Sequence, residues 1–273
     1  MQKEEIKTFL QKILLLNAVS ISIVLAVYAY LGVFSRYIAD DYCHSGLIKT
    51  NGFFGAVQAQ YLTISNRYMI LVIPYLTDLF GPRGQSLLPA LMIVLWLIAL
   101  VWLLAEVCKL LSLHWNKLII FTLSGLLVFF VVLQAPARYQ SIYWEASAVV
   151  HFIPFVLITF LVASVLAVVR KENGQEHNFT WSLFYFIIVF LIGGFSEMND
   201  ALIFALALLS LVSIFLWFPL RKGHKYFLSL WITSSIFISS LLSMAVMSLS
   251  PGVAFRVKQT PTIFVFLKRI LTY

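Results

Sequence analysis

Two adjacent carboxylates, Asp40 and Asp41, follow the first long apolar run of the chain, in the segment SRYIADDYCHSG. Neighbouring residues do not share a face of a helix or a strand, so the two side chains cannot both point at one atom. One carboxylate can therefore face a site as a general base or a cation ligand, while the other orients backbone or partner groups. The alternative is a solvated turn after a helix C-terminus, where negative charge costs about 0.3–1 kcal/mol. Because tyrosines and His44 crowd around the pair, we favour the functional interpretation.

A second polar cluster lies between two later apolar runs, in the segment QAPARYQSIYWEASAVVHFIPF. Its candidate substrate-binding residues are Arg138, Tyr143, Trp144, Glu145 and His151. Arginine can hold a phosphate or a carboxylate with two hydrogen bonds, and Tyr or Trp can stack on a sugar ring or pack on a lipid chain. If the segment is helical, Arg138 and Glu145 share one face. The alternatives are an interfacial aromatic belt with an Arg–Glu ion pair and, for His151, an interhelical hydrogen bond.

Two further segments place charged side chains beside apolar runs. In LIGGFSEMNDALIF, the adjacent glycines favour a break in the helix before Glu197 and Asp200, which are candidate substrate-binding residues. A carboxylate near the hydrocarbon normally faces a polar cavity, although an ordinary tight turn between two helices would use the same residues. In SLSPGVAFRVK, Arg256 can hold a lipid phosphate or can simply extend its charge to the membrane interface.

The composition indicates what kind of protein carries these clusters. The chain of 273 residues is 62% hydrophobic and only 11% charged, with a mean hydropathy of +0.96. Its apolar runs of about 20 residues match the ~30 Å thickness of membrane hydrocarbon. The net charge of +8 lies in short loops between apolar runs, which is typical of membrane topology and argues against a nucleic-acid partner. The chain is therefore predicted to be an all-α, polytopic transmembrane bundle, with residues 1–273 forming one integral membrane domain.

The apolar runs predict seven membrane spans, at residues 10–33, 86–107, 118–134, 147–169, 181–196, 201–218 and 227–249. The Lys and Arg residues of the short loops favour a cytoplasmic N-terminus in the inner (plasma) membrane of the cell. All four polar clusters then face the extracytoplasmic side. Residues 56–80, in the first outer segment, predict an amphipathic helix at the membrane surface, or a surface helix that leads into a partly buried one. Two cysteines far apart in the sequence predict neither a disulfide nor a metal site.

Several short motifs also occur in a recognisable order: ADDYC after the first span, an Asn-Arg-Tyr stretch, YWEASAVVHFIP, GGFSEMNDAL and SPGVAFR. Together they resemble the bacterial polytopic membrane glycosyltransferases of the GT-C superfamily, near the glucosyltransferases that modify O-antigen. The resemblance covers most of the chain. It departs at Asn66-Arg67, where Gly-Arg would be expected, and at residues 251–253, where Pro-Gly-Val replaces Pro-Gly-Asn.

The resemblance implies that a sugar moves from a polyprenyl-phosphate-linked donor to a glycan or lipid acceptor at the outer face of the membrane. It implies that an acid of the first outer loop, Asp40 or Asp41, acts as the base or organises the site. Contacts to the lipid phosphate would come from Arg67, Arg138 or Arg256. A divalent cation could take the place of an arginine beside the leaving group.

Two other functions stay open. A flippase or transporter for a lipid-linked sugar would use the same residue types, but it would place ionisable groups near the middle of the membrane. Their expected position at one face favours the transferase. The chain is also shorter than such transferases and stops in the apolar run TIFVFLKRILTY. It could therefore be a non-catalytic truncated remnant, or the N-terminal part of a longer protein.

Overall fold

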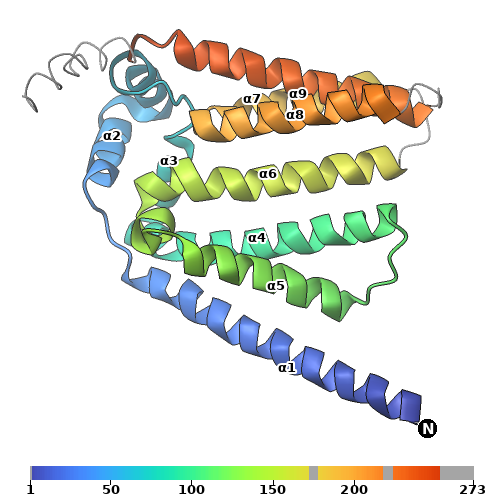
Figure 1. Cartoon of the computed structure of the whole chain (residues 1–273). Helices are drawn as coiled ribbons and strands as arrows, with labels where there is room; N and C mark the ends of the chain where they lie inside the picture. Colours follow the sequence, from blue (N-terminus) through green and yellow to red (C-terminus); the bar gives the residue numbers. More distant parts are fainter. Residues whose placement is uncertain (1, 172–177, 218–223, 253–273) are drawn as a thin grey trace, which may run out of the picture.

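The computed structural model describes residues 2–171, 178–217 and 224–252, and every regular element in these residues is helical (Figure 1). Helix α2 (Asp40–Ala59) and four short elements connect the other helices: η1 (Gly32–Phe34), η2 (Gln60–Ile64), α3 (Val72–Asp78) and η3 (Tyr139–Tyr143). The long helices are α1 (Gln2–Leu31), α4 (Pro82–Leu110), α5 (Lys117–Gln134), α6 (Glu145–Lys171), α7 (Asn178–Gly193), α8 (Glu197–Trp217) and α9 (His224–Ser248). The predicted all-α class is confirmed.

Among the described residues, six helices are long and apolar enough to cross a membrane: α1, α4, α5, α6, α8 and α9. Helix α7 is also apolar but shorter, and it ends at Gly193, where a turn leads into α8. Its 16 residues extend over about 24 Å, somewhat less than the hydrocarbon thickness. The predicted spans therefore correspond to six full-length candidates and one short helix.

Helices that follow one another in the chain run in opposite directions, which gathers one set of their ends in a single region (Figure 1). The C-terminal ends of α1, α5, α7 and α9 and the N-terminal ends of α4, α6 and α8 meet there, beside α2 and α3. We call this region the site end, because the described residues of the polar clusters lie in it. That the site end faces the extracytoplasmic side stays a prediction from the distribution of Lys and Arg.

The connection between α1 and α4 is more divided than the sequence suggested. Helix α2 begins at Asp40, kinks at Gly52 (φ +67°) and continues to Ala59, where a π-helical turn follows. The backbone then becomes extended at Ser65, and α3 has only seven residues. The structure thus divides residues 56–80, which were expected to form a surface helix alone or one that leads into a partly buried helix, into the end of α2, η2 and α3. The extended residue and the turns after it bring this connection back over the site end.

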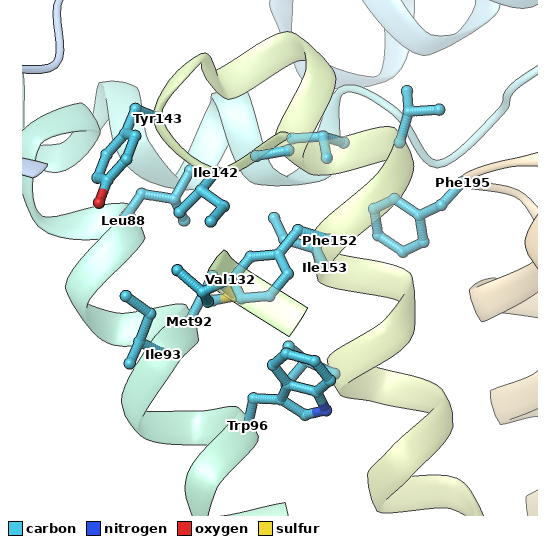
Figure 2. Packing of buried hydrophobic residues seen from close by; sticks show 14 of the residues in the cluster. Leu88, Met92, Ile93, Trp96, Val132, Ile142, Tyr143, Phe152, Ile153 and Phe195 are labelled. Atoms are coloured by element: carbon cyan, nitrogen blue, oxygen red, sulfur yellow. The ribbon is translucent and has the colours of Figure 1, made fainter. Parts of the chain in front are cut away.

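Two groups of buried apolar side chains hold the helices together. The first lies between α4 and α6, where Trp96 meets Phe152 edge to face with ring centroids 5.4 Å apart (Figure 2). The second joins α6, α7, α8 and α9 around the fully buried Tyr185. Because lipid is as apolar as these side chains, close packing and interhelical hydrogen bonds stabilise such contacts. Ser239 of α9 supplies one of them, donating to the carbonyl oxygen of Phe186 at 2.6 Å.

At the end opposite the site, α4 and α6 are joined by charged groups. The Glu106 carboxylate of α4 is only 2% exposed. It accepts hydrogen bonds from Nε and Nη2 of Arg170 on α6, at 2.6 and 3.2 Å, and from Nζ of Lys109 at 2.7 Å. A buried carboxylate needs such partners to offset the loss of hydration. The cluster therefore fixes the distance between α4 and α6 at this end.

Candidate functional site

Asp41 is the residue on which the site end is assembled. Its carboxylate is 2% exposed, and Oδ1 accepts a hydrogen bond from the backbone amide of Ala146 at 2.9 Å. Oδ2 accepts from the amide of Ile38 at 2.9 Å and from Nε2 of Gln85 at 3.0 Å. Burial raises the pKa of Asp41, and the hydrogen bonds from Ile38 and Ala146 oppose that shift. One carboxylate thus ties the start of α2 to the starts of α4 and α6.

Asp40 has the opposite environment, since its side chain is exposed and lines a cavity. Both acids lie in the first turn of α2, where the partial positive charge of a helix N-terminus favours carboxylates. The alternative of a helix C-terminus does not apply, because α1 ends at Leu31 and α2 is a new helix. The adjacent acids point in different directions, as the sequence suggested: Asp40 lines the cavity, and Asp41 accepts hydrogen bonds from backbone amides. The catalytic role of Asp40 stays a prediction.

The cavity at the site end has a volume of about 430 Å³ and lies between α2, η2, the turn after η2 and the start of α6. Its charged and aromatic lining consists of Asp40, His44, Arg67, Trp144 and His151. The size falls in the range of small-molecule sites, which is about 300–1,000 Å³. Of the four polar clusters expected on the extracytoplasmic side, the first three supply groups at or beside this cavity.

The charges in the cavity are separated. Asp40 and Asp41 are the groups that act electrostatically on His44, whereas Arg67 acts on His151. The cavity, which we call the polar cavity, therefore has an acidic side on α2 and a basic side next to α6. Such a separation can hold a substrate that carries a proton donor at one end and an anion at the other.

Arg67 is held in place by the turn between α7 and α8. Its Nε lies 3.0 Å from Oε2 of Glu197, in an ion pair whose side chains are 28% and 43% exposed. The segment that carries Arg67 is also fixed by its backbone, because the amide of Met69 donates to the carbonyl oxygen of Gly194 at 3.0 Å. Glu197 thus acts on the polar cavity through Arg67, although it is not part of the lining.

Gly194 permits the ring of Tyr68 to pack against this turn. A Cβ on Gly194 would lie 2.3 Å from Cε2 of Tyr68, so only glycine lets the tyrosine ring approach the turn. The Tyr68 hydroxyl then donates to the carbonyl oxygen of Phe190 at 2.5 Å and lies 3.0 Å from Oγ of Ser243. Burial raises the pKa of Tyr68 to about 12, so the hydroxyl keeps its proton for these contacts.

His151 belongs to two cavities. Besides the polar cavity it lines a second one of about 360 Å³, between α4, α5, η3 and α6. The other walls of this apolar cavity include Trp96, Val132, Phe152 and Phe155. Trp144, on the polar side, is oriented by a hydrogen bond from its Nε1 to the carbonyl oxygen of Ile38 at 3.3 Å. A polar compartment and an apolar compartment are therefore adjacent, with His151 between them.

Glu145 lies behind the polar cavity and does not line it. Its carboxylate is 2% exposed and accepts a hydrogen bond from the Thr77 hydroxyl of α3. Asp78, the next residue of α3, accepts from the Tyr37 hydroxyl at 2.5 Å. Burial and the neighbouring carboxylates raise the pKa of Tyr37, so this hydroxyl stays protonated. These groups join α3 to α6 and to the segment before α2.

Arg138 and Tyr143 also lie outside the polar cavity. The segment is not one helix, because Trp144 is extended between η3 and α6, so Arg138 and Glu145 do not share a helical face. Tyr143 donates to the carbonyl oxygen of Tyr28 at 2.8 Å, and Nη1 of Arg138 lies 3.4 Å from the Tyr28 hydroxyl. Both residues therefore attach η3 to α1.

The last two residues that were expected at the site are Asp200 and Arg256. Asp200 is fully buried among α7, α8 and α9, next to Ser243, and is not part of the polar cavity. Arg256 lies outside the described residues. His44 and Ser65, which were not among the candidate residues, line the polar cavity. For His44 a sequence signal existed, since it lies one helical turn after Asp40. For Ser65 there was none.

In the described ranges, no group of three or more His, Cys, Asp or Glu side chains is placed to hold a metal ion. Comparisons with protein-family models, with curated proteins and with solved structures found no match for this chain. The site itself is therefore the basis for assigning a function.

Proposed function

We propose that the chain is a GT-C-type membrane glycosyltransferase. It transfers a sugar from a polyprenyl-phosphate-linked donor to a glycan or lipid acceptor at the outer face of the membrane. One observation carries the proposal. A polar cavity with a carboxylate on one side and a guanidinium on the other adjoins an apolar cavity between α4, α5 and α6.

The two compartments suit the two parts of a lipid-linked sugar. The chain of the donor fits among Trp96, Phe152 and Phe155 in the apolar cavity. The phosphate then lies near His151, where Arg67 can donate hydrogen bonds to its oxygens. The sugar extends toward Asp40 on the acidic side. A water-soluble substrate would need only the polar cavity, so the adjoining apolar walls favour an amphiphile.

In the proposed reaction, Asp40 takes the proton of the acceptor hydroxyl while the hydroxyl oxygen attacks the anomeric carbon. The bond between the anomeric carbon and the phosphate oxygen breaks, and its electron pair leaves with the polyprenyl phosphate. Arg67 offsets the charge that develops on this phosphate. The ion pair with Glu197 keeps the guanidinium in position between turnovers. Asp41 holds α2 so that Asp40 faces the cavity.

A flippase for the same substrate would require ionisable groups that both membrane faces can reach. In the described part of the chain, the acids of the candidate site lie at the site end. The buried acid at the opposite end, Glu106, is paired with Arg170 and Lys109. This distribution favours transfer over transport.

The test uses the purified chain in liposomes with a panel of radiolabelled polyprenyl-phosphate hexoses and a panel of glycan and lipid acceptors. We expect turnover of at least one donor to free polyprenyl phosphate. Asp40→Asn should reduce it at least about 100-fold, in line with the loss of a general base. Glu5→Gln, which removes an exposed carboxylate from α1, serves as the matched control. Donor release by Asp40→Asn at the wild-type rate, or movement of intact donor between leaflets without release, would refute the proposal.

A further inference from the structure

His44 lies one helical turn after Asp40, on the face of α2 that borders the polar cavity. The side chain is 7% exposed, and its Nδ1 is enclosed without a hydrogen-bond partner. The imidazole makes no hydrogen bond with any residue of the described ranges. Buried polar side chains in proteins nearly always have a partner. Because Nδ1 is enclosed, the imidazole can gain a partner only through Nε2, toward the polar cavity that it lines.

The environment of His44 determines its charge. Burial lowers the pKa of the imidazole, and the carboxylates of Asp40 and Asp41 oppose this shift only in part. The basic residue of the cavity, Arg67, is on the other side, next to His151. The enclosed Nδ1 leads to the same conclusion, since an imidazolium would bury an N–H group that has no acceptor. His44 is therefore neutral.

The same enclosure decides which nitrogen carries the single proton. A buried N–H without an acceptor is rarer in proteins than a buried acceptor that lacks a donor. The proton of the neutral ring therefore belongs on Nε2, and Nδ1 carries only its lone pair. Nε2 is then a hydrogen-bond donor on the acidic side of the polar cavity, where carboxylates and sugar hydroxyls are acceptors.

We propose that His44 is a positioning residue that donates the Nε2–H group to an oxygen of the transferred sugar. This inference rests on the proposed function and assigns the sugar its place beside Asp40. His44 keeps its proton throughout the reaction, because the proton of the acceptor hydroxyl goes to Asp40. The residue thus orients the anomeric carbon toward the attacking oxygen, and it is not the base.

Two substitutions separate the role of a donor from that of a base. The amide nitrogen of Gln reaches the place of His Nε2, whereas that of the shorter Asn reaches only the place of Nδ1. We expect His44→Gln to keep kcat/KM for the donor within about threefold of the wild type. His44→Asn should lower it about tenfold, the usual effect of losing one neutral hydrogen bond. Equal losses in the two variants would show that a donor at the place of Nε2 cannot replace the imidazole and would overturn the proposal, and so would full activity in both.

The tautomer gives a readout that does not depend on turnover. Histidine labelled with ¹⁵N in the full chain, in lipid nanodiscs, reports which ring nitrogen is protonated, and His44→Gln identifies the signal. We expect a neutral ring with the proton on Nε2 at neutral pH. An imidazolium, or a proton on Nδ1, would overturn the inference even if sugar transfer is observed. If the wild type transfers no sugar but shows this tautomer, the proposed function fails while the donor assignment stands.

Discussion

The backbone amide of Ala146 donates to Oδ1 of Asp41 at 2.9 Å, although the two residues are 105 positions apart in the chain. Ala146 is the second residue of α6, and Asp41 is the second residue of α2. The acid that joins the starts of α2, α4 and α6 is therefore next to the acid proposed for chemistry. Substitutions at the two positions should have different effects.

Asp41→Asn should destabilise the protein by about 1–3 kcal/mol, because an amide cannot accept all three hydrogen bonds that the carboxylate now accepts. Thermal unfolding in detergent measures the effect. Asp40→Asn is the matched control, since Asp40 is exposed and loses only its favourable interaction with the start of α2, so the free energy of unfolding should fall by less than about 1 kcal/mol. Equal stability of the two variants would contradict the assigned role of Asp41.

Glu197→Gln should change stability by no more than about 1 kcal/mol, because the ion pair with Arg67 is partly exposed. Its effect should appear in donor binding, since Arg67 loses the group that orients it. Arg67→Lys should raise KM for the donor more strongly, because an ammonium cannot hold a phosphate with two parallel hydrogen bonds. Steady-state kinetics with varied donor concentration tests both. Unchanged KM in Arg67→Lys would remove Arg67 from the phosphate site.

Chemical labelling of the two free cysteines tests which side of the membrane the site end faces and whether a ligand occupies the polar cavity. Cys43 is exposed and lines the polar cavity, whereas Cys108 is buried. We expect an impermeant maleimide added to intact cells to label Cys43, and Cys43→Ser to abolish the labelling. Polyprenyl phosphate should slow the reaction by filling the cavity. Labelling of Cys43 only after the cytoplasmic face is opened would reverse the predicted topology.

Gly194→Ala should reduce activity, because its Cβ would lie 2.3 Å from Cε2 of Tyr68 and displace the segment that carries Arg67. Gly46→Ala is the control: Gly46 lies in α2 with nothing within 4 Å of the added carbon. Alanine there should stabilise the helix by about 0.5–1 kcal/mol and leave transfer unchanged. Equal activity of the two variants would show that the contact of Tyr68 with the turn does not position Arg67.

The buried His44 predicts how stability depends on pH. Its pKa in the folded protein lies below the ordinary value of 6.5, so below about pH 6.5 the unfolded chain takes up a proton that the folded protein does not. Stability contributed by neutral His44 is therefore lost as the pH falls below that value. His44→Gln should lose less stability than the wild type between about pH 7.5 and 5.5. Parallel unfolding curves over this range would contradict the neutral state.

The sequence predicted the helical membrane bundle and the gathering of polar groups at one end, because apolar runs and polar interruptions are local signals. It also predicted that Asp40 and Asp41 would face different ways, but not which acid would be buried. That choice depends on the amide of Ala146 and on Gln85, which are distant in the chain. The sequence also did not predict the extended backbone at Trp144. This break prevents Arg138 and Glu145 from sharing one helical face.

The contacts that hold α4 and α6 together at both ends limit how these helices can move. Asp41 connects their first turns at the site end, and the Glu106–Arg170 pair locks them at the other end. The two helices therefore behave as a rigid frame. The remaining wall of the apolar cavity is the end of α5 and the connection that runs through Pro136 to η3. In the proposed function, a lipid that enters this cavity from the bilayer would therefore displace the connection through Pro136 more readily than α4 or α6.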